Sequence, residues 1–77
     1  MSGLTTHGKG ERLRAIEQML YRRTGGVHVS ELAEHFEVHR STIYRDLAAL
    51  STAGVPIWNE GAVWHLNRDS YLTHVRR

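Results

Sequence analysis

The sequence contains no cysteine, and only 1 of its 77 residues is proline. The absence of thiols excludes disulfide staples, thiolate zinc fingers and thiol catalysis. Apolar runs are never longer than a few residues, so no segment is a candidate for a membrane span or for the core of a signal peptide. These absences make a cytoplasmic protein the expectation.

Lysine is also scarce, because Lys9 is the one lysine and arginine supplies the rest of the 10 basic residues. The formal net charge is only +2. Arginine pairs bidentately with phosphates and with guanine edges better than lysine does. On charge alone, a nucleic-acid partner and a mildly basic solvated surface are equal interpretations.

Apolar residues recur at helical spacing in several segments of the chain. Residues 1–10 come before them and are rich in glycine, serine and threonine, which predicts a flexible lead. Ser30 is a good N-cap, and Gly54 supplies the left-handed residue that commonly ends a helix. The predicted helices are Glu11–Arg23, Glu31–Phe36 and Arg40–Ala53.

Extended segments separate and follow these helices. Asn59–Gly61 carries turn chemistry between two runs of apolar and aromatic residues, which predicts a hairpin directly after the third helix. Alternation along the hairpin places Trp64 toward the core and Trp58 on the opposite face. The predicted strands are Val27–Val29, Val55–Trp58 and Val63–Leu66.

This order of elements predicts a winged helix-turn-helix, an α+β fold that is mainly α, with three helices and a C-terminal β-hairpin wing. The domain is expected to span residues 11–67. Residues 68–77 are polar and basic, and predict a C-terminal extension or linker outside the core. The expected core consists of Leu13, Ile16, Leu20, Leu32, Phe36, Ile43, Leu47, Leu50, Ile57, Trp64 and Leu66.

The predicted third helix has a polar face opposite its apolar stripe. At 100° per residue, this face consists of Ser41, Tyr44, Arg45, Ala48 and Thr52. It holds no acidic residue. A helix with small or polar residues and N-terminal donors can enter the major groove, which is roughly 12 Å wide, and reach base edges. Arg40, Ser41 and Arg45 are therefore candidates for contacts with bases or phosphates. The competing interpretation is that both arginines merely solvate an exposed helix.

Two further residues of this helix lie at the borders of its faces. For Tyr44, a phosphate hydrogen bond from the hydroxyl and partial packing in the core are equal alternatives. Asp46 lies on the flank away from the polar face. There, an ion pair with Arg12 or Arg14 is favoured over any contact with DNA.

Several motifs in this order resemble a known family. They are the run Ser41–Leu47 (STIYRDL), Leu50 and Gly54 after it, Gly54–Ile57 (GVPI) at the entry to the hairpin, and Leu66–Leu72 (LNRDSYL). Over most of Glu11–Leu72 the chain is similar to the DeoR-like winged helix-turn-helix domain, especially the one at the N-terminus of WYL-domain transcriptional regulators.

The resemblance implies a transcriptional regulator, expected to be a repressor, that binds double-stranded DNA. The third helix would lie in the major groove and the wing on adjacent backbone or in the minor groove. With the interpretation of the helix faces, it gives the candidate DNA-contacting residues Ser30, His39, Arg40, Ser41, Thr42, Tyr44, Arg45, Trp58, Asn59 and Gly61.

The chain departs from the family pattern at two positions of the turn. Glu37 stands where members often have glycine, and a non-glycine residue in a left-handed turn costs roughly 1 kcal/mol. His39 stands where they often have serine, which is a better N-cap. WYL regulators also continue into a ligand-sensing domain. A fragment of a longer regulator and a stand-alone binder are both open interpretations.

Other function classes find less support in the sequence. There are 6 histidines, but His35 and His39 straddle the predicted turn and no carboxylate completes a site, so neither a metal nor a cofactor is expected. No nucleophile, base and orienter form a recognisable set, so the chain is not expected to be an enzyme and no small-molecule ligand is expected. The main rival is a protein-interaction or dimerisation module without DNA binding.

Assembly is expected to be weak. One recognition helix reads too few base pairs for a unique genomic site, so two copies would pair on half-sites roughly 34 Å apart. The resemblance implies that dimerisation comes mainly from the effector domain. The expectation is therefore a monomer or weak dimer in solution that forms a homodimer on paired half-sites.

Overall fold

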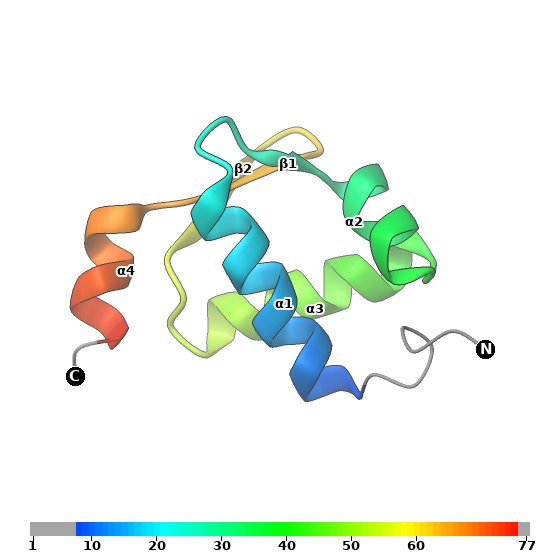
Figure 1. Ribbon diagram of the computed structural model, residues 1–77, viewed down its shortest axis with the longest axis horizontal. Coiled ribbons are helices and arrows are strands. Elements are labelled where there is room, and N and C mark those ends of the chain that lie inside the picture. The colour runs from blue at the N-terminus through cyan, green and yellow to red at the C-terminus, as the bar shows by residue number, and fades with distance from the viewer. Residues whose placement is uncertain (1–7, 76–77) are drawn as a thin grey trace.

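The computed structural model describes residues 8–75, which form helices and one small sheet. The helices are α1 (Lys9–Arg22), α2 (Val29–Phe36), α3 (Arg40–Thr52) and α4 (Arg68–Val75), and the strands are β1 (Val27–His28), β2 (Ile57–Glu60) and β3 (Val63–Leu66). Figure 1 shows α1 in front of α3, the sheet along one edge, and α2 and α4 at opposite ends of the molecule. No helix among the described residues is long and apolar enough to cross a membrane.

The sheet is antiparallel with the strand order β1-β3-β2. Its register pairs Ile57 with Leu66 and Trp58 with His65, so Ile57 and Leu66 share the face that packs on the helices. Trp64 lies on this inner face as well, and Trp58 lies on the outer face, as the alternation predicts. The predicted α+β winged helix-turn-helix fold is confirmed.

The first two helices each begin two residues earlier than predicted. Ser30 is not an N-cap, because α2 already begins at the fully buried Val29 and His28 is the cap residue. The lead predicted for residues 1–10 ends early, since α1 begins at Lys9; residues 1–7 lie outside the described residues.

The predicted hairpin turn at Asn59–Gly61 begins two residues too early. Asn59 and Glu60 belong to β2, and the turn consists of Gly61 and Ala62, where Gly61 has a φ of +59°. A two-residue hairpin turn requires such positive φ values, which glycine adopts without strain. The Asn59 side chain spans the turn, because its Nδ2 donates to the carbonyl oxygen of Gly61 at 2.9 Å.

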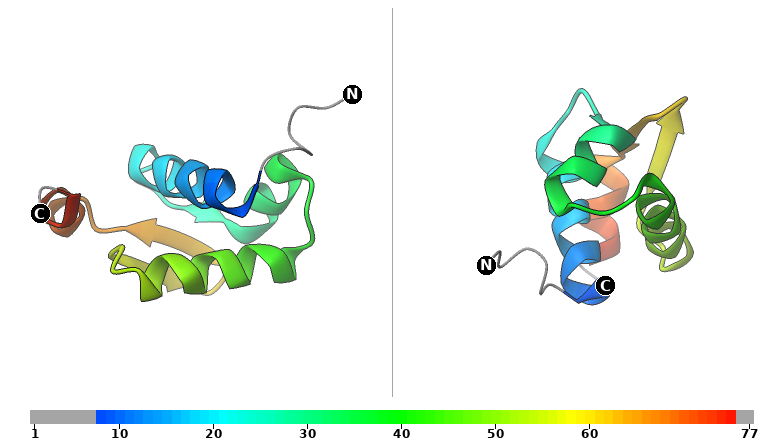
Figure 2. Two further views of the ribbon diagram at one scale, coloured as in Figure 1. Left: turned by 90° about the horizontal axis from the view of Figure 1, so that it is seen from below. Right: turned by 90° about the vertical axis from the view of Figure 1, so that its right-hand side faces the viewer.

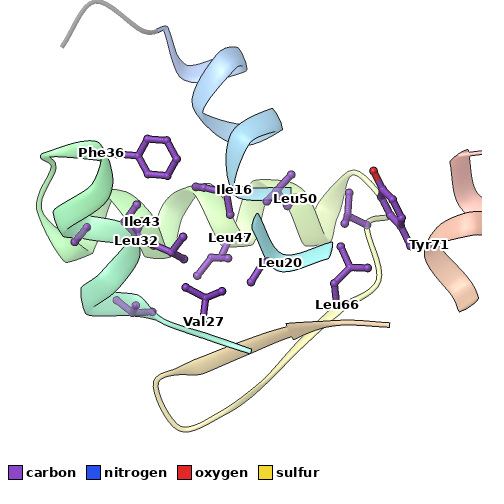
Figure 3. Close-up of a cluster of buried hydrophobic side chains, with 13 residues drawn as sticks. Ile16, Leu20, Val27, Leu32, Phe36, Ile43, Leu47, Leu50, Leu66 and Tyr71 are labelled. Carbon is purple, nitrogen blue, oxygen red and sulfur yellow. The ribbon is translucent and has the colours of Figure 1, made fainter. Parts of the chain in front are cut away.

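The core runs the length of the molecule between α1, α2, α3 and the sheet (Figure 3). Most predicted core residues are buried, but Leu13, Ile57 and Trp64 are only partly buried at its margin. The buried hydrophobic residues that the sequence analysis left out of the core are Val27, Val29, Ala33, Val55 and Tyr71. Val55 does not belong to the predicted strand, because its N–H closes the end of α3 on the Leu50 carbonyl oxygen at 3.0 Å.

The expectation that residues 68–77 lie outside the core is wrong for Tyr71. This residue lies on α4 and is 8% exposed. Its ring lies 5.4 Å from that of Tyr21 on α1, and the guanidinium of Arg68 lies 4.4 Å from the Tyr21 ring. A hydrogen bond to the Glu17 carboxylate, followed by burial, raises the pKa of Tyr71 to about 12. These contacts hold α4 against α1.

Candidate nucleic-acid interface

The turn between α2 and α3 places the start of α3 at the surface. Glu37 adopts the left-handed conformation, with φ 58° and ψ 45°. The N–H groups of Glu37 and Val38 donate to the carbonyl oxygens of Glu34 at 3.2 Å and Ala33 at 3.0 Å, which is the Schellman pattern that ends helices. Gly54 ends α3 with the same pattern and a φ of +98°. Glu37 therefore occupies a position that favours glycine.

A histidine caps each of the two helices that flank this turn. His39 precedes α3, and its Nδ1 accepts from the backbone N–H of Ser41 at 3.1 Å. Nδ1 also lies 3.0 Å from Ser41 Oγ. His28 precedes α2 and accepts from the N–H of Ser30 at 3.0 Å in the same way. Histidine thus satisfies an N–H that is otherwise orphaned at each helix start.

The polar face of α3 is exposed and carries the predicted residue types. Arg40, Ser41 and Arg45 are exposed, Tyr44 is 44% exposed, and Thr42 is half-buried. No acidic side chain of α3 lies on this face, because Asp46 points into the molecule. The two views of Figure 2 show this side of α3 free of the other described elements, with β2 along the same side of the molecule. Of the alternatives for Tyr44, packing in the core is the less favoured.

Asp46 forms the ion pair that the helix geometry predicts, and its partner is Arg12 rather than Arg14. Nε and Nη2 of Arg12 donate to Oδ2 and Oδ1 of Asp46 at 2.5 and 3.1 Å. The side chains are 16% and 1% exposed, respectively. The hydrogen bond to Asp46 raises the pKa of the Arg12 guanidinium, and burial partly opposes it. The pair joins α1 to α3 across their interface.

The remaining candidates lie in two places. Ser30 is half-buried in the first turn of α2, where its N–H is already bonded to His28. Trp58, Asn59 and Gly61 are exposed on the hairpin. The structure thus groups His39, Arg40, Ser41, Thr42, Tyr44 and Arg45 on one helix start, with Ser30 on the preceding helix and the other three candidates on the wing.

The wing differs in chemistry from the start of α3. Trp58 is 46% exposed, and its ring stacks on His65 at 4.2 Å with an interplanar angle of 13°. Glu60 Oε1 lies 3.4 Å from His65 Nε2, but the two atoms do not form a hydrogen bond. Neither lysine nor arginine occurs between Ile57 and Leu66. The cationic side chains of this candidate interface are therefore Arg40 and Arg45.

Three residues of the site had no assigned role in the sequence analysis. His65 is half-buried under Trp58, and Gly26 approaches it so closely that an added Cβ would lie 2.7 Å from His65 Cε1. His28 caps α2. The pairing of Trp58 with His65 follows from the observed turn at Gly61 and Ala62, and the predicted turn at Asn59–Gly61 gives a different register. The cap could not be predicted either, because histidine is not a preferred N-cap.

The histidines do not gather around a common point in the part of the chain that is described. His35 packs edge-to-face on Phe36 at 4.6 Å between ring centroids, while His39 caps α3. Among residues 8–73, no group of three or more histidine, aspartate or glutamate side chains has the geometry of a metal site.

The comparison with known proteins agrees with this geometry. A segment of 49 residues is 47% identical to the uncharacterized HTH-type transcriptional regulator YobV of Bacillus subtilis (strain 168). The match covers 64% of the chain and 15% of YobV, so the chain corresponds to a small part of that relative. Residues 12–61, which include α2, the turn, α3 and β2, match the family model described as HTH domain. Because that match spans more than half of the sequence, the chain belongs to the HTH domain family.

Proposed function

We propose that this domain binds double-stranded DNA as the sequence-reading part of a transcriptional regulator, with α3 in the major groove. The observation that carries the proposal is the exposed, acid-free start of α3, where Arg40, Ser41 and Arg45 are accessible together. Arginine contacts guanine edges bidentately, and short polar side chains allow the helix backbone to approach the bases. Membership of the HTH domain family supports the same function.

Individual contacts follow from the positions of the candidates. Arg40, Ser41 and Arg45 lie nearest the bases, and Ser30, Thr42 and Tyr44 bind phosphates, assisted by the start of α2. His39 stands at the same helix end. On the wing, Trp58, Asn59 and Gly61 lie against adjacent backbone or the minor groove, with Glu60 turned away from phosphate.

The finer identity rests on the sequence motifs. The run Ser41–Leu47 (STIYRDL) favours a DeoR-like domain of the kind that precedes a WYL domain, and repression by occupancy of a promoter is the regulatory direction that we propose. Residues 11–67 are the proposed DNA-binding unit. Two copies would pair on half-sites about one helical turn, roughly 34 Å, apart. A series of duplexes with varied half-site spacing tests this pairing, and binding that is indifferent to spacing contradicts it.

A salt titration of binding to duplex DNA tests the proposal. Fluorescence anisotropy with a random duplex and with a duplex from a selection of bound sequences measures Kd at several salt concentrations. Arg45→Ala should weaken binding to the selected duplex by about 1 to 3 kcal/mol if Arg45 reads a base. If it contacts a phosphate, the loss should be equal on both duplexes and the salt slope should fall by about 1.

Arg14→Ala is the matched control. Arg14 is exposed on α1, so this variant loses the same charge away from α3. It should bind both duplexes much as the wild-type domain does. Equal losses in Arg45→Ala and Arg14→Ala would show only a diffuse charge effect. Absence of salt-dependent binding by the wild-type domain would contradict the proposed function and favour a protein-interaction module.

A further inference from the structure

We propose that Arg12 and Asp46 are positioning residues, whose bidentate ion pair fixes the rotation of α3 about its own axis and so the direction in which its outer face points. This inference rests on the proposed function for its DNA consequence. It concerns a pair on the buried side of α3, whereas Arg45 and Tyr44 are exposed. Neither residue is expected to touch DNA.

The apolar contacts of α3 constrain its rotation less sharply than a directional bond does. Ile43, Leu47 and Leu50 are buried against α1, α2 and the sheet. Burial of apolar surface is non-directional and depends on the area removed from water. A small rotation of α3 can therefore keep most of this area buried.

A bidentate arginine–carboxylate pair is directional. Two parallel N–H···O bonds fix both the distance and the angle between the two planar groups. Here they run from Arg12 on α1 to Asp46 on α3, at 2.5 and 3.1 Å, with Asp46 only 1% exposed. The carboxylate can thus point in one direction only, and it is anchored to a different helix.

Asp46 directly follows Arg45, so the two side chains are separated by about 100° around the helix axis. When the direction of Asp46 about the helix axis is fixed, the direction of Arg45 is fixed as well. A rotation of about 20° moves atoms that lie 5 to 6 Å from the axis by roughly 2 Å. Such a shift breaks hydrogen bonds to base edges, whose donor–acceptor distances lie within about 2.7 to 3.2 Å.

Stability alone does not account for this pair. Taking two charges out of water costs free energy that their attraction only partly repays, and apolar replacements of similar volume are often neutral or stabilising. The apolar core already includes Ile43 and Leu47, the residues before and after Asp46 on the inner face of α3. The pair is therefore expected to matter for geometry more than for the free energy of unfolding.

The decisive variant is the double substitution Arg12→Met and Asp46→Leu. Its thermal midpoint should equal or exceed that of the wild-type domain. Its ratio of affinities for the selected and the random duplex should fall about tenfold, the loss expected when one base pair is misread. Arg12→Lys keeps the positive charge but cannot make the bidentate hydrogen bonds. Its ratio of affinities for the selected and the random duplex should also fall, by less than in the double variant. This variant keeps the proposal testable if the double variant folds poorly.

The double variant Arg23→Ala and Glu31→Ala is the matched control. It removes the ion pair between the end of α1 and α2, which joins Nη2 and Oε2 at 2.6 Å and does not involve α3. Its selectivity ratio should stay unchanged, because any effect of the lost charges acts on both duplexes alike. A comparable fall in this control would overturn the assignment to Arg12 and Asp46.

Residual dipolar couplings of the backbone amides in α1 and α3 test the geometry without DNA. In the Arg12→Met and Asp46→Leu variant, the couplings of Arg40–Thr52 should change relative to those of Lys9–Arg22 or average toward smaller values. Unchanged couplings, or an unchanged selectivity ratio in a folded variant, would overturn the inference. A wild-type domain that binds no DNA would instead contradict the proposed function, and the couplings would still decide the positioning role.

Discussion

The inner and outer faces of α3 carry different kinds of residue on one helix. On the inner face, Ile43 and Leu47 are 0% exposed and the charge of Asp46 is paired. On the outer face, Tyr44 is 44% exposed and Arg45 lies in solvent. The inner face is suited to stability and orientation, and the outer face to contacts with a partner. Substitutions on the two faces should therefore separate the free energy of unfolding from the affinity for DNA.

The largest expected effect comes from the inner face. Leu47→Ala should lower the free energy of unfolding by about 2 to 5 kcal/mol, because it removes a fully buried side chain and leaves a cavity. Ala48→Ser, at an exposed neighbouring position, should change it by less than about 0.5 kcal/mol. Urea unfolding followed by circular dichroism measures both. An unfolding curve for Leu47→Ala that matches the wild type would show that the faces are misassigned.

The far end of the core offers a pH-dependent test. Because the folded state raises the pKa of Tyr71 to about 12 from its ordinary value of 10.0, its contribution to stability is complete below pH 10.0 and is lost as the pH rises toward 12. Tyr71→Phe should cost about 1 kcal/mol at neutral pH, through loss of the bond to Glu17. It should also flatten the decline of stability over this alkaline range.

Thermal unfolding of wild type and Tyr71→Phe across the alkaline range checks this expectation. Tyr44→Phe is the control, since Tyr44 is 44% exposed on the outer face. Its alkaline profile should follow that of the wild type. Parallel profiles for wild type and Tyr71→Phe would show that the folded state does not raise the pKa of Tyr71.

In the turn before α3, a substitution by glycine should stabilise the domain rather than destabilise it. Glu37→Gly should raise the free energy of unfolding by about 1 kcal/mol, because the left-handed conformation strains any residue with a Cβ. Gly54→Ala introduces the same strain at the equivalent position after α3, where φ is +98°, and should destabilise the domain. Chemical denaturation measures the free energy of unfolding of both variants. Destabilisation by Glu37→Gly would contradict the described turn.

The smallest expected effect lies on the wing. Trp58→Ala should weaken DNA binding by less than about tenfold and leave its salt dependence unchanged, because no charge is removed. Leu72→Ala is a suitable control, since Leu72 on α4 is 45% exposed, close to the 46% of Trp58. Anisotropy titrations measure both variants. If only the wing variant abolished binding, the wing rather than α3 would be the principal contact.

The sequence predicts the parts of this domain whose residues repeat at a helical or strand period. The apolar stripe of α3 and the strand Val63–Leu66 are of this kind. The ion pair of Asp46 was predicted from its position on the helix, on the flank away from the polar face. Element ends depend instead on single backbone contacts. Val29 could be assigned to a strand or a helix from its type alone, and the cap at His28 makes it the first residue of α2.

Helix α4 was missed because Tyr71 and Leu72 are too few apolar residues to establish a period. A different signal was present. Asn67 precedes the helix, and its Oδ1 accepts from the N–H of Ser70 at 3.0 Å, while Asp69 lies in the first turn. An N-cap asparagine followed by an early acidic residue is a helix start. The histidine caps carry no comparable signal, since their role depends on the local geometry of Nδ1.

Nuclear magnetic resonance titration of the labelled domain with duplex DNA tests the central claim most directly. Backbone amide shifts should change most at His39–Arg45, less at Ile57–Gly61, and little along Lys9–Arg22. These changes should weaken as salt is added, because phosphate contacts release counterions. The largest changes on α1 or α4, or no changes at low salt, would contradict the assignment of the outer face of α3 as the DNA-binding surface.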